Sequence, residues 1–473
     1  VFLEERRTLL GIPAGYELCF RAWILLLPHR ARAASVSAVC QDEIASAPPR
    51  DALIRAAMGA TAAILAIIYF GPAFVGVFKP QPDDYRDFVQ EWLSVRNYRA
   101  GEPIYLPQRA AMKREIGADI PGFDVGLRYN AHPPVAVLLA LPWAMFDDYA
   151  TAHLAWNLVT VPLFFLSIVL LTREYGIAVQ WWAIFPILTL TLLCQSLLCQ
   201  LYQGQLNFVI LMLLVAALMA DRRGNQLAAG AAVGVAMALK IVPGLLLVYF
   251  AATRRWRAVA AAIVVAAGLN AIALAVFGID AFRDYVTDVL PSLKVFRGGW
   301  RNISLTGYWA HVGMGIGAPA ACAIAGVICQ FAVVAMVWIV SRRATTPEER
   351  DRALGLAILG IPLASPIAWA HYFVFLLPPL LLLWQRLPRG LLFVAFAVAT
   401  AALWAPERFY PELAIGRTAA AELTNTSPIP PGIVLPVLGL GPFTYALVVL
   451  FLLKAFAPFA PLGEANHRGA EAP

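Results

Sequence analysis

Long apolar stretches alternate with short polar clusters along most of this chain. Stretches that approach or reach the length needed to cross a bilayer lie at about 52–78, 150–172, 181–199, 205–220, 256–278, 318–341, 352–368, 371–386, 389–405 and 436–456. They are too long and too uniformly apolar for barrel strands, so the backbone must satisfy its hydrogen bonds as helices. The pattern predicts an all-α polytopic membrane protein with about ten crossings and two hairpins, or ten to thirteen transmembrane or re-entrant helices in all.

Two apolar stretches depart from this pattern. Pro133 to Phe146 is too short to span, which predicts a re-entrant or interfacial segment. Gln226 to Ala252 is interrupted by Lys240 and Pro243, and basic residues flank it on both sides. Because basic flanks are typical of the cytoplasmic side, this stretch is predicted to enter the membrane and return as a hairpin of two short helices.

Charge assigns the remaining loops to sides of the membrane. The chain is 60% hydrophobic and 14% charged, and its net charge of +7 is spread over short clusters, which argues against nucleic-acid binding. Arg50 and Arg55 place the N-terminus in the cytoplasm, and the basic loops at 221–224, 254–257, 341–343 and 386–389 follow there. The six cysteines show neither a disulfide framework nor metal-site spacing.

The domain organisation follows from these assignments. Residues 1–51 are expected to form a tail, disordered or not native, and 459–473 a cytoplasmic tail. Between them lies a transmembrane domain, 52–458, with external loops at 79–133 and 280–315. The first loop is long enough to indicate a function. The spacing of Phe88, Trp92 and Val95 within it predicts an amphipathic helix on the membrane surface.

Three carboxylates, Asp83, Asp84 and Asp87, follow the first apolar stretch directly. They mark either a solvated helix end or a catalytic base at the outer surface, and Asp87 is the candidate general base. The polar clusters at 202–205, 297–302 and 365–372 are assigned to the same face. A transporter would instead place its site near the midplane, so this one-sided convergence favours an interfacial active site.

Other polar residues on this face each allow two interpretations. Lys240 and His371 are candidates for binding a phosphate, whereas snorkelling of the lysine and capping by the histidine are the alternatives. Arg301 and Asn302 are candidates for binding phosphate or sugar, or they belong to a solvated loop. Gln203 and Gln205 flank a glycine that permits close approach, and they bind either sugar or a neighbouring helix.

Several motifs resemble those of glycosyltransferase family 87, the polyprenyl-phosphate-mannose-dependent mannosyltransferases and related arabinofuranosyltransferases. They are Asp87-Phe88, Gly101-Glu102-Pro103-Ile104-Tyr105, Pro133-Pro134, Gly204-Gln205-Leu206-Asn207, Ala229-Gly230, Lys240-Ile241-Val242-Pro243, Asn302-Ile303-Ser304-Leu305 and the run from Ser365 to His371. Their order and spacing cover roughly residues 55–400. His132, Ile303 and Tyr372 depart from the family pattern, which usually has an aromatic residue, a glutamine and a second histidine at these positions.

The resemblance implies a GT-C fold and inverting, metal-independent transfer without a cofactor. Asp87 would be the base, and His371 would lie near the donor phosphate. Together with the interpretation of the polar residues above, this predicts that Lys240, His371 and Arg301 bind the donor phosphate. The expected substrate contacts are Asp84, Tyr105, His132, Gln203, Gln205, Asn302 and Trp369.

The predicted function is a glycosyltransferase of the bacterial inner membrane with its active site facing the periplasm. The sugar, mannose or another hexose or arabinofuranose, would pass from a polyprenyl-phosphate donor to an envelope glycan or lipid acceptor. The alternatives are a polyprenyl-lipid flippase without chemistry and a glycan ligase or polymerase.

Overall fold

The computed structural model describes residues 50–79, 85–117, 128–177, 179–423 and 429–458, and within these ranges it consists of helices and connections without a strand. The predicted all-α class is therefore confirmed. Asp83 and Asp84 lie outside the described residues, as do the predicted tails apart from residues 50 and 51. The chain forms two compact units, the smaller containing 50–79 and 179–194, and the larger lying within 80–177 and 195–458.

The smaller unit pairs the first long helix with a later, shorter one. Helix α2 (Arg50–Val77) lies beside η3 (Trp181–Ala183) and α7 (Ile184–Leu193). At Gly59 the two approach closely, since a Cβ there would lie 3.0 Å from Cβ of Phe185. The Arg55 guanidinium lies 5.6 Å from the centre of the Trp182 ring.

Fewer helices than expected have the length and composition of a membrane span. In the described ranges five do, Ala52–Val77, Tyr149–Glu174, Trp256–Gly298, Pro319–Arg343 and Leu435–Phe456, and two bent pairs raise the number to seven. The predicted ten full crossings are not confirmed, because several apolar stretches form shorter helices or begin with charged residues. These are α9 (Asn207–Arg222), α16 (Pro347–Ala364), α17 (Leu377–Arg386) and α18 (Leu391–Trp404).

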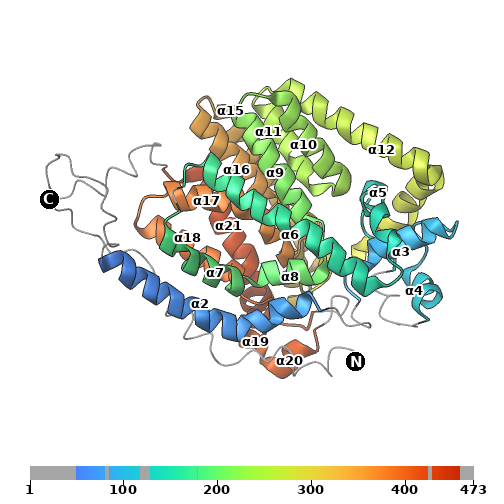
Figure 1. The fold of residues 1–473 in the computed structure, drawn as a ribbon, viewed down its shortest axis with the longest axis horizontal. Coiled ribbons are helices and arrows are strands. Elements are labelled where there is room, and N and C mark those ends of the chain that lie inside the picture. The colour runs from blue at the N-terminus through green and yellow to red at the C-terminus, as the bar shows by residue number, and fades with distance from the viewer. Residues whose placement is uncertain (1–49, 80–84, 118–127, 178, 424–428, 459–473) are drawn as a thin grey trace, which may run out of the picture. The chain divides into compact units, whose positions relative to one another are not determined.

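The hairpin predicted around Lys240 is confirmed. Helix α10 (Gln226–Leu239) ends at Lys240, whose backbone is extended, and the chain continues through η4 (Val242–Leu245) and α11 (Leu246–Ala252) into α12 (Trp256–Asp284). A Cβ on Gly230 would clash with Ala258, and one on Gly234 with Ala262. These two contacts mean that α10 and α12 run parallel, so the chain between them must return to its starting end (Figure 1).

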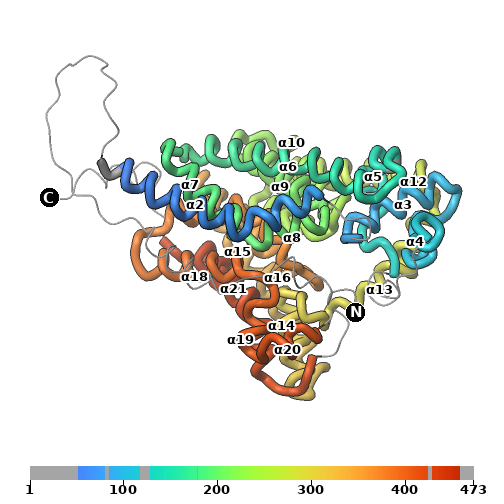
Figure 2. Tube along the Cα trace, turned by 60° about the horizontal axis from the view of Figure 1, so that its bottom comes forward, coloured from blue at the N-terminus to red at the C-terminus, as the bar shows by residue number. Residues whose placement is uncertain are grey.

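The segment predicted as the first external loop folds into a small helical assembly. It contains α3 (Val89–Arg99) and α4 (Gln108–Ile116), followed by α5 (Pro134–Ala140) and η2 (Leu141–Met145), and it lies against the C-terminal part of α12 (Figures 1 and 2). The helix expected from Phe88, Trp92 and Val95 is therefore present as α3. Its predicted place on the membrane surface is wrong, because its polar residues Gln90, Glu91 and Ser94 are as buried as its apolar ones. α3 is a core helix of the loop.

The rest of the larger unit is a bundle with two chemically different ends. Its remaining helices are α6 (Tyr149–Glu174), α8 (Gln195–Gln203), η5 (Tyr285–Val289), α13 (Leu290–Ser292), η6 (Leu293–Gly298), α14 (Leu305–Gly315), α15 (Pro319–Arg343), η7 (Ala370–Leu376), α19 (Phe409–Ile415), α20 (Arg417–Ala421), η8 (Leu435–Leu440) and α21 (Gly441–Phe456). The segment 280–315, predicted as a second loop, is thus largely helical.

Basic residues tie helix ends together at one end of this bundle, which we call the basic end. Arg255, just before α12, forms an ion pair with Asp221 at the end of α9. Arg352, near the start of α16, donates hydrogen bonds of 2.7 and 2.6 Å to the carbonyls of Lys454 and Ala455 at the end of α21. The basic clusters that the sequence assigned to one side therefore gather together. The opposite end receives Asp87, Lys240 and His371.

Candidate active site

Asp87 lies in the turn that leads into α3. A second turn, at the end of α8, forms hydrogen bonds to this turn through Gln203. The side-chain oxygen of Gln203 accepts a hydrogen bond of 3.2 Å from the Asp87 backbone N–H, and the Gln203 carbonyl accepts one of 2.9 Å from Phe88. The two turns meet at Gly204, which has a φ of +63° and whose Cβ would lie 2.8 Å from Cβ of Phe88. Only glycine permits both the conformation and the contact. The expected close approach at this glycine is confirmed.

Gln205 lies between the Asp87 carboxylate and the Lys240 ammonium. Its Nε2 donates a hydrogen bond of 2.7 Å to Oδ2 of Asp87, and its Oε1 is 3.5 Å from Nζ of Lys240. One amide thus contacts both charged groups. The carboxylate and the ammonium are linked but do not form a direct ion pair.

Lys240 is buried at the tip of the hairpin, with amide oxygens and an aromatic ring around it. Its Nζ donates a hydrogen bond of 3.2 Å to Oδ1 of Asn207 and lies 4.1 Å from the centre of the Tyr372 ring. No described carboxylate forms an ion pair with it. A buried ammonium is stabilised by a nearby anion, so this position suits a ligand with negative charge.

His371 reaches the same place from η7. Its carbonyl accepts a hydrogen bond of 3.1 Å from Nδ2 of Asn207, and its imidazole is buried. Within the described residues, Nε2 of this ring has no hydrogen-bond partner. The ring interacts electrostatically with Lys240, His132 and Arg301. The structure therefore brings together Asp87, Lys240 at the hairpin and His371 of η7, and the roles predicted for them stay predictions.

The environment of Asp87 raises the pKa of its carboxyl group. Burial is the largest cause, and the nearby carboxylate of Glu91 acts in the same direction. The hydrogen bond from Gln205 and the electrostatic interactions with His132 and Lys240 lower this pKa and partly offset the effect. A carboxylate that is desolvated but still ionised is a better base than an exposed one.

His132 forms a buried pair with Glu91, one helical turn beyond Asp87. Nδ1 of His132 and Oε1 of Glu91 are in close hydrogen-bond contact. The Tyr105 hydroxyl donates a hydrogen bond of 2.8 Å to the His132 carbonyl. The structure thus gives Tyr105 and His132 protein partners, and their predicted contact with substrate stays a prediction.

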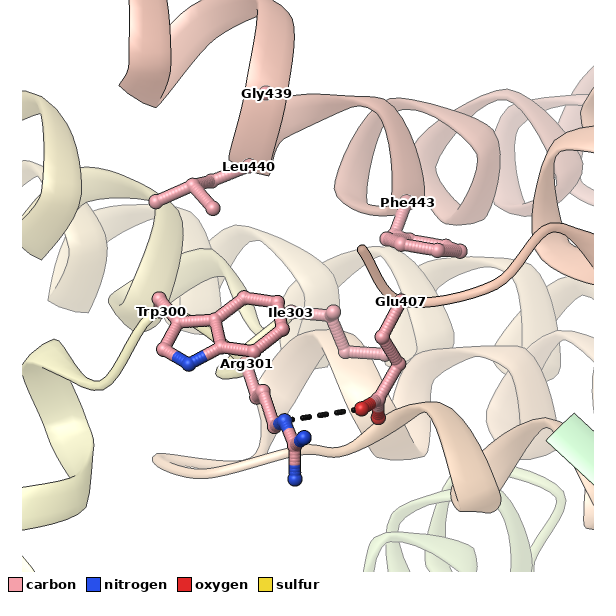
Figure 3. Close-up of a pocket in the computed structure, with 7 residues that line it drawn as sticks. All are labelled: Trp300, Arg301, Ile303, Glu407, Gly439, Leu440 and Phe443. Atoms are coloured by element: carbon pink, nitrogen blue, oxygen red, sulfur yellow. Dashed lines mark ion pairs between the residues drawn. The ribbon is translucent and has the colours of Figure 1, made fainter. Parts of the chain in front are cut away.

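Arg301 lies beside a small pocket near this cluster. Glu407, in the connection before α19, forms an ion pair of 3.1 Å with Nε of Arg301 (Figure 3). The Arg301 guanidinium also lies 4.9 Å from the centre of the Trp300 ring. The pocket is lined by Trp300, Arg301, Ile303, Glu407, Gly439, Leu440 and Phe443. Arg301 therefore already has an anionic partner, unlike Lys240.

Asn302 uses its amide within the protein. Nδ2 donates to the carbonyls of Arg297 and Pro366 at 3.0 and 3.1 Å, while Oδ1 accepts from the N–H groups of Ser304 and Ala368 at 3.2 and 3.0 Å. This side chain joins the 297–304 segment to the turn before η7, and its predicted contact with sugar would require these bonds to change.

Trp369 is half-buried, with its ring 5.7 Å from that of Phe296 in an edge-on arrangement. Its predicted contact with substrate stays a prediction. That of Asp84 lies outside the described residues. No group of three or more metal-binding side chains is found in the part of the chain that the structure describes.

Three residues of this region were not selected from the sequence. Glu91 follows Asp87 by four positions, which is about one helical turn, and this spacing could have been recognised in the sequence. Asn207 lies in one of the motifs quoted above. A single asparagine there is as typical of a hydrogen bond between helices as of a functional site, so the sequence did not select it. Glu407 is about a hundred residues from Arg301 in sequence, and no local pattern indicates their pairing.

Comparison with known proteins supports the resemblance seen in the motifs. Residues 130–366 match the model of glycosyltransferase family 87. This region contains Lys240 and Arg301, whereas Asp87 and His371 lie outside it.

Two relatives have similar names. The chain is 28% identical over 280 residues to the polyprenol-phosphate-mannose-dependent alpha-(1-2)-phosphatidylinositol pentamannoside mannosyltransferase of Mycobacterium tuberculosis, covering 56% of this chain and 59% of that protein. It is 28% identical over 358 residues to the polyprenol-phosphate-mannose-dependent alpha-(1-2)-phosphatidylinositol mannoside mannosyltransferase of Mycolicibacterium smegmatis, covering 70% and 76%. No solved structure matches the chain. Since the family match extends over half of the sequence, this chain belongs to glycosyltransferase family 87.

Proposed function

We propose that this protein is a membrane mannosyltransferase that takes mannose from a polyprenyl phosphate and transfers it to a mannose-containing glycolipid. The family and the names of the relatives support the donor and the kind of acceptor. The observation that carries the proposal is the contact sequence from Asp87 through Gln205 to Lys240, and from there through Asn207 to His371. This contact sequence connects the candidate base, Asp87, to Lys240 and His371, two side chains that can bind an anion.

Asp87 acts as the general base in this proposal. A hydroxyl of the acceptor gives its proton to the carboxylate while its oxygen attacks the anomeric carbon from the face opposite the phosphate. The configuration at that carbon is therefore inverted. The raised pKa of Asp87 increases its affinity for the proton at the moment of attack.

Lys240 and His371 receive the leaving phosphate. The Lys240 ammonium has only neutral partners among the described residues, and Nε2 of His371 has none, so both groups are available to a phosphate oxygen. Stabilising the negative charge released on the phosphate lowers the barrier to transfer. Arg301 takes part once it exchanges Glu407 for the phosphate.

We infer that the site faces the periplasm from the inner membrane. The basic end of the bundle, with its clusters at 221–224 and 254–257, has the composition of a cytoplasmic surface, and the site lies at the other end. A polyprenyl phosphate reaches such a site laterally from the bilayer.

The test is transfer by the purified protein in detergent or nanodiscs. Radiolabelled polyprenyl-phosphate-mannose is incubated with phosphatidylinositol mannosides, and lipid products are separated by chromatography. We expect a product that is one mannose larger and is absent with Asp87→Asn. Polyprenyl-phosphate-glucose and polyprenyl-phosphate-arabinofuranose serve as competing donors.

Two results would replace this function with another. Preferred transfer of a different sugar would retain the enzyme class and change the donor. If labelled lipid crossed reconstituted vesicles without any product, the protein would be a lipid transporter.

A further inference from the structure

Glu91 and His132 form a buried acid–base pair in the interior of the segment predicted as the first external loop. Glu91 lies on α3, and His132 lies just before α5, 41 positions away in the sequence. The exposed fractions of the two residues are 4% and 7%. An ionised carboxylate only accepts hydrogen bonds, so Nδ1 of the ring carries the hydrogen and Nε2, on the far side of the ring from Glu91, is left as the acceptor.

The backbone around His132 is fixed by a set of directed hydrogen bonds. Asn130 accepts from the His132 N–H at 2.9 Å and donates to the Gln90 carbonyl at 3.2 Å and to Oγ of Ser94 at 3.1 Å. The side chain of Gln90 accepts from the Ala131 N–H at 2.9 Å. Together with the bond from Tyr105, these contacts hold the histidine against α3. Such support is expected where the direction of a side chain matters to function.

Stability alone does not account for a buried pair of ionisable side chains. Burying two ionisable groups costs desolvation energy, and apolar residues of similar size often stabilise a core as well or better. The neighbouring core provides the comparison, since Phe88, Trp92 and Met112 fill the same assembly without any charge. The pair therefore points to a chemical role.

The pair lies next to the site described above. Asp87 is in the turn that leads into α3, four residues before Glu91, and its carbonyl accepts a hydrogen bond of 3.0 Å from the Gln90 N–H. Asp87 interacts electrostatically with both His132 and Glu91, and His371 with His132. The ionisable groups near the pair are Asp87, Tyr105 and Tyr285, Lys240 at the hairpin tip and His371 of η7.

We propose that His132 accepts the proton that Asp87 takes from the acceptor, and that Glu91 positions His132 for this task. The inference rests on the proposed function. In the transfer step the hydroxyl proton moves to Asp87, the hydroxyl oxygen bonds to the anomeric carbon, and the carbon–oxygen bond to phosphate breaks with its electrons on the phosphate. The Asp87 carboxyl group then gives the proton to Nε2 of His132, directly or through one water. This step restores the carboxylate, and Glu91 stabilises the imidazolium until it releases the proton to water.

Added imidazole provides the main test, with mannosyl transfer by the full-length protein as the assay. We expect His132→Ala to lower kcat by about 10²-fold with a smaller change in donor KM. Imidazole in the buffer should restore part of this loss, and substituted imidazoles should restore it in the order of their basicity. A purely structural histidine would not respond in that way. His132→Gln, which keeps most of the volume, replaces the alanine variant if the latter does not fold.

Glu91 is tested by a pair of substitutions and a matched control. Glu91→Gln should lower kcat and change the pH dependence of kcat, whereas Glu91→Asp should retain much of the activity. Glu115 is a suitable control, because this carboxylate of the same loop forms ion pairs with Arg96 and Arg114 at 2.7 and 2.9 Å and touches no histidine. Glu115→Gln should leave the pH profile and the imidazole response unchanged.

The outcomes of these experiments distinguish failure of the proton-acceptor role from failure of the proposed function. If the wild-type protein transfers no mannose, the proposed function fails. If the wild type is active and the folded His132 variants keep its kcat, or lose activity without any response to imidazole, the proton-acceptor role is overturned while the function stands.

Discussion

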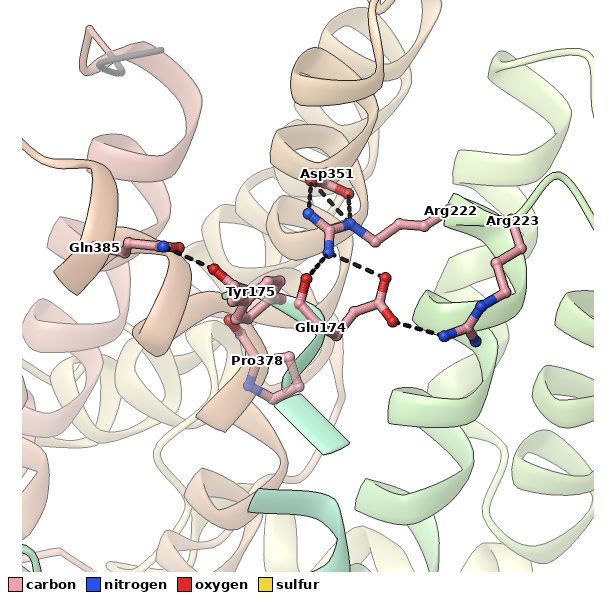
Figure 4. A network of polar contacts seen from close by, with 7 residues as sticks. All are labelled: Glu174, Tyr175, Arg222, Arg223, Asp351, Pro378 and Gln385. Atoms are coloured by element: carbon pink, nitrogen blue, oxygen red, sulfur yellow. Dashed lines mark hydrogen bonds and ion pairs between the residues drawn. The ribbon is translucent and has the colours of Figure 1, made fainter. Parts of the chain in front are cut away.

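The two ends of the larger unit both concentrate charged residues, but they arrange them in opposite ways. At the basic end, Arg222 binds both oxygens of Asp351 at distances of 2.8–3.2 Å and also contacts Glu174, which binds Arg223 in turn (Figure 4). At the other end, the Asp87 carboxylate and the Lys240 ammonium are separated by the amide of Gln205. Charges satisfy one another in the first region and are kept apart in the second.

This difference separates structural from functional use of charge. A bidentate arginine–carboxylate pair holds helix ends in register, and at the basic end it is reinforced by Gln385, which donates a hydrogen bond of 2.8 Å to the Tyr175 carbonyl (Figure 4). A base and a phosphate-binding cation that paired with each other would be lost to the substrate. Gln205 orients both groups and neutralises neither.

The largest expected effect is that of Asp87→Asn. Removal of the base should lower kcat/KM by about 10³- to 10⁴-fold, because the amide that replaces the carboxylate cannot take the proton. Transfer of labelled mannose measures it, and thermal unfolding should be unchanged. Asp147→Asn is the control, since Asp147 lies in the connection before α6 with its side chain 93% exposed and forms a surface ion pair with Arg96. Normal turnover by Asp87→Asn would exclude Asp87 as the general base.

The equivalent substitution at the basic end, Asp351→Asn, should change stability and not catalysis. Asp351→Asn leaves the half-buried Arg222 guanidinium without its bidentate partner, and we expect the free energy of unfolding to fall by about 3 kcal/mol. Denaturant unfolding in mild detergent measures this loss. The kcat of the protein that remains folded should be normal. A specific loss of kcat in the folded fraction would mean that the two ends are coupled.

Lys240→Met should affect donor binding without lowering stability. The substitution removes a buried ammonium that has no anionic partner among the described residues, so the fold should be equally stable or more stable. The donor KM should rise by about 30- to 100-fold as the phosphate loses a charged contact. Steady-state kinetics at varied donor concentration would show the change. Lys240→Arg, which keeps the charge, should recover part of the affinity, and an unchanged KM in both variants would exclude the contact.

The smallest expected effect is a shift in the pH dependence of kcat/KM. It comes from a substitution that gives the site a direct ion pair like those at the basic end. Gln205→Glu replaces the bridging amide by a carboxylate that can pair directly with Lys240. Activity requires ionised Asp87, whose pKa is raised by burial and lowered by the Gln205 hydrogen bond. Losing that bond and adding a like charge raise this pKa further, so the acid limb of kcat/KM should move to higher pH by about one unit. If the acid limb of kcat/KM does not move, it reports the ionisation of a group other than Asp87.

The elements of the fold were predictable to different degrees. The hairpin at Lys240 followed from basic flanks on both sides of a stretch too short to cross twice, and the turn at Gly204 followed from a glycine between two glutamines. The number of spans did not follow, because apolar stretches such as 352–368 and 389–405 form helices that begin with charged residues or remain short. α3 was placed on the membrane surface because its apolar spacing was visible while the partners of its polar residues were not.

By itself the sequence determined the helical class, the family and the gathering of basic loops at one end, because hydropathy, charge and motif order are local properties of the chain. Only the tertiary structure decided which polar residues meet. Gln205 bridging Asp87 and Lys240, Glu91 bonding His132, and Glu407 pairing with Arg301 join positions from 35 to more than a hundred residues apart. Such contacts depend on how helices pack, and hydropathy does not specify the direction in which a buried polar side chain points.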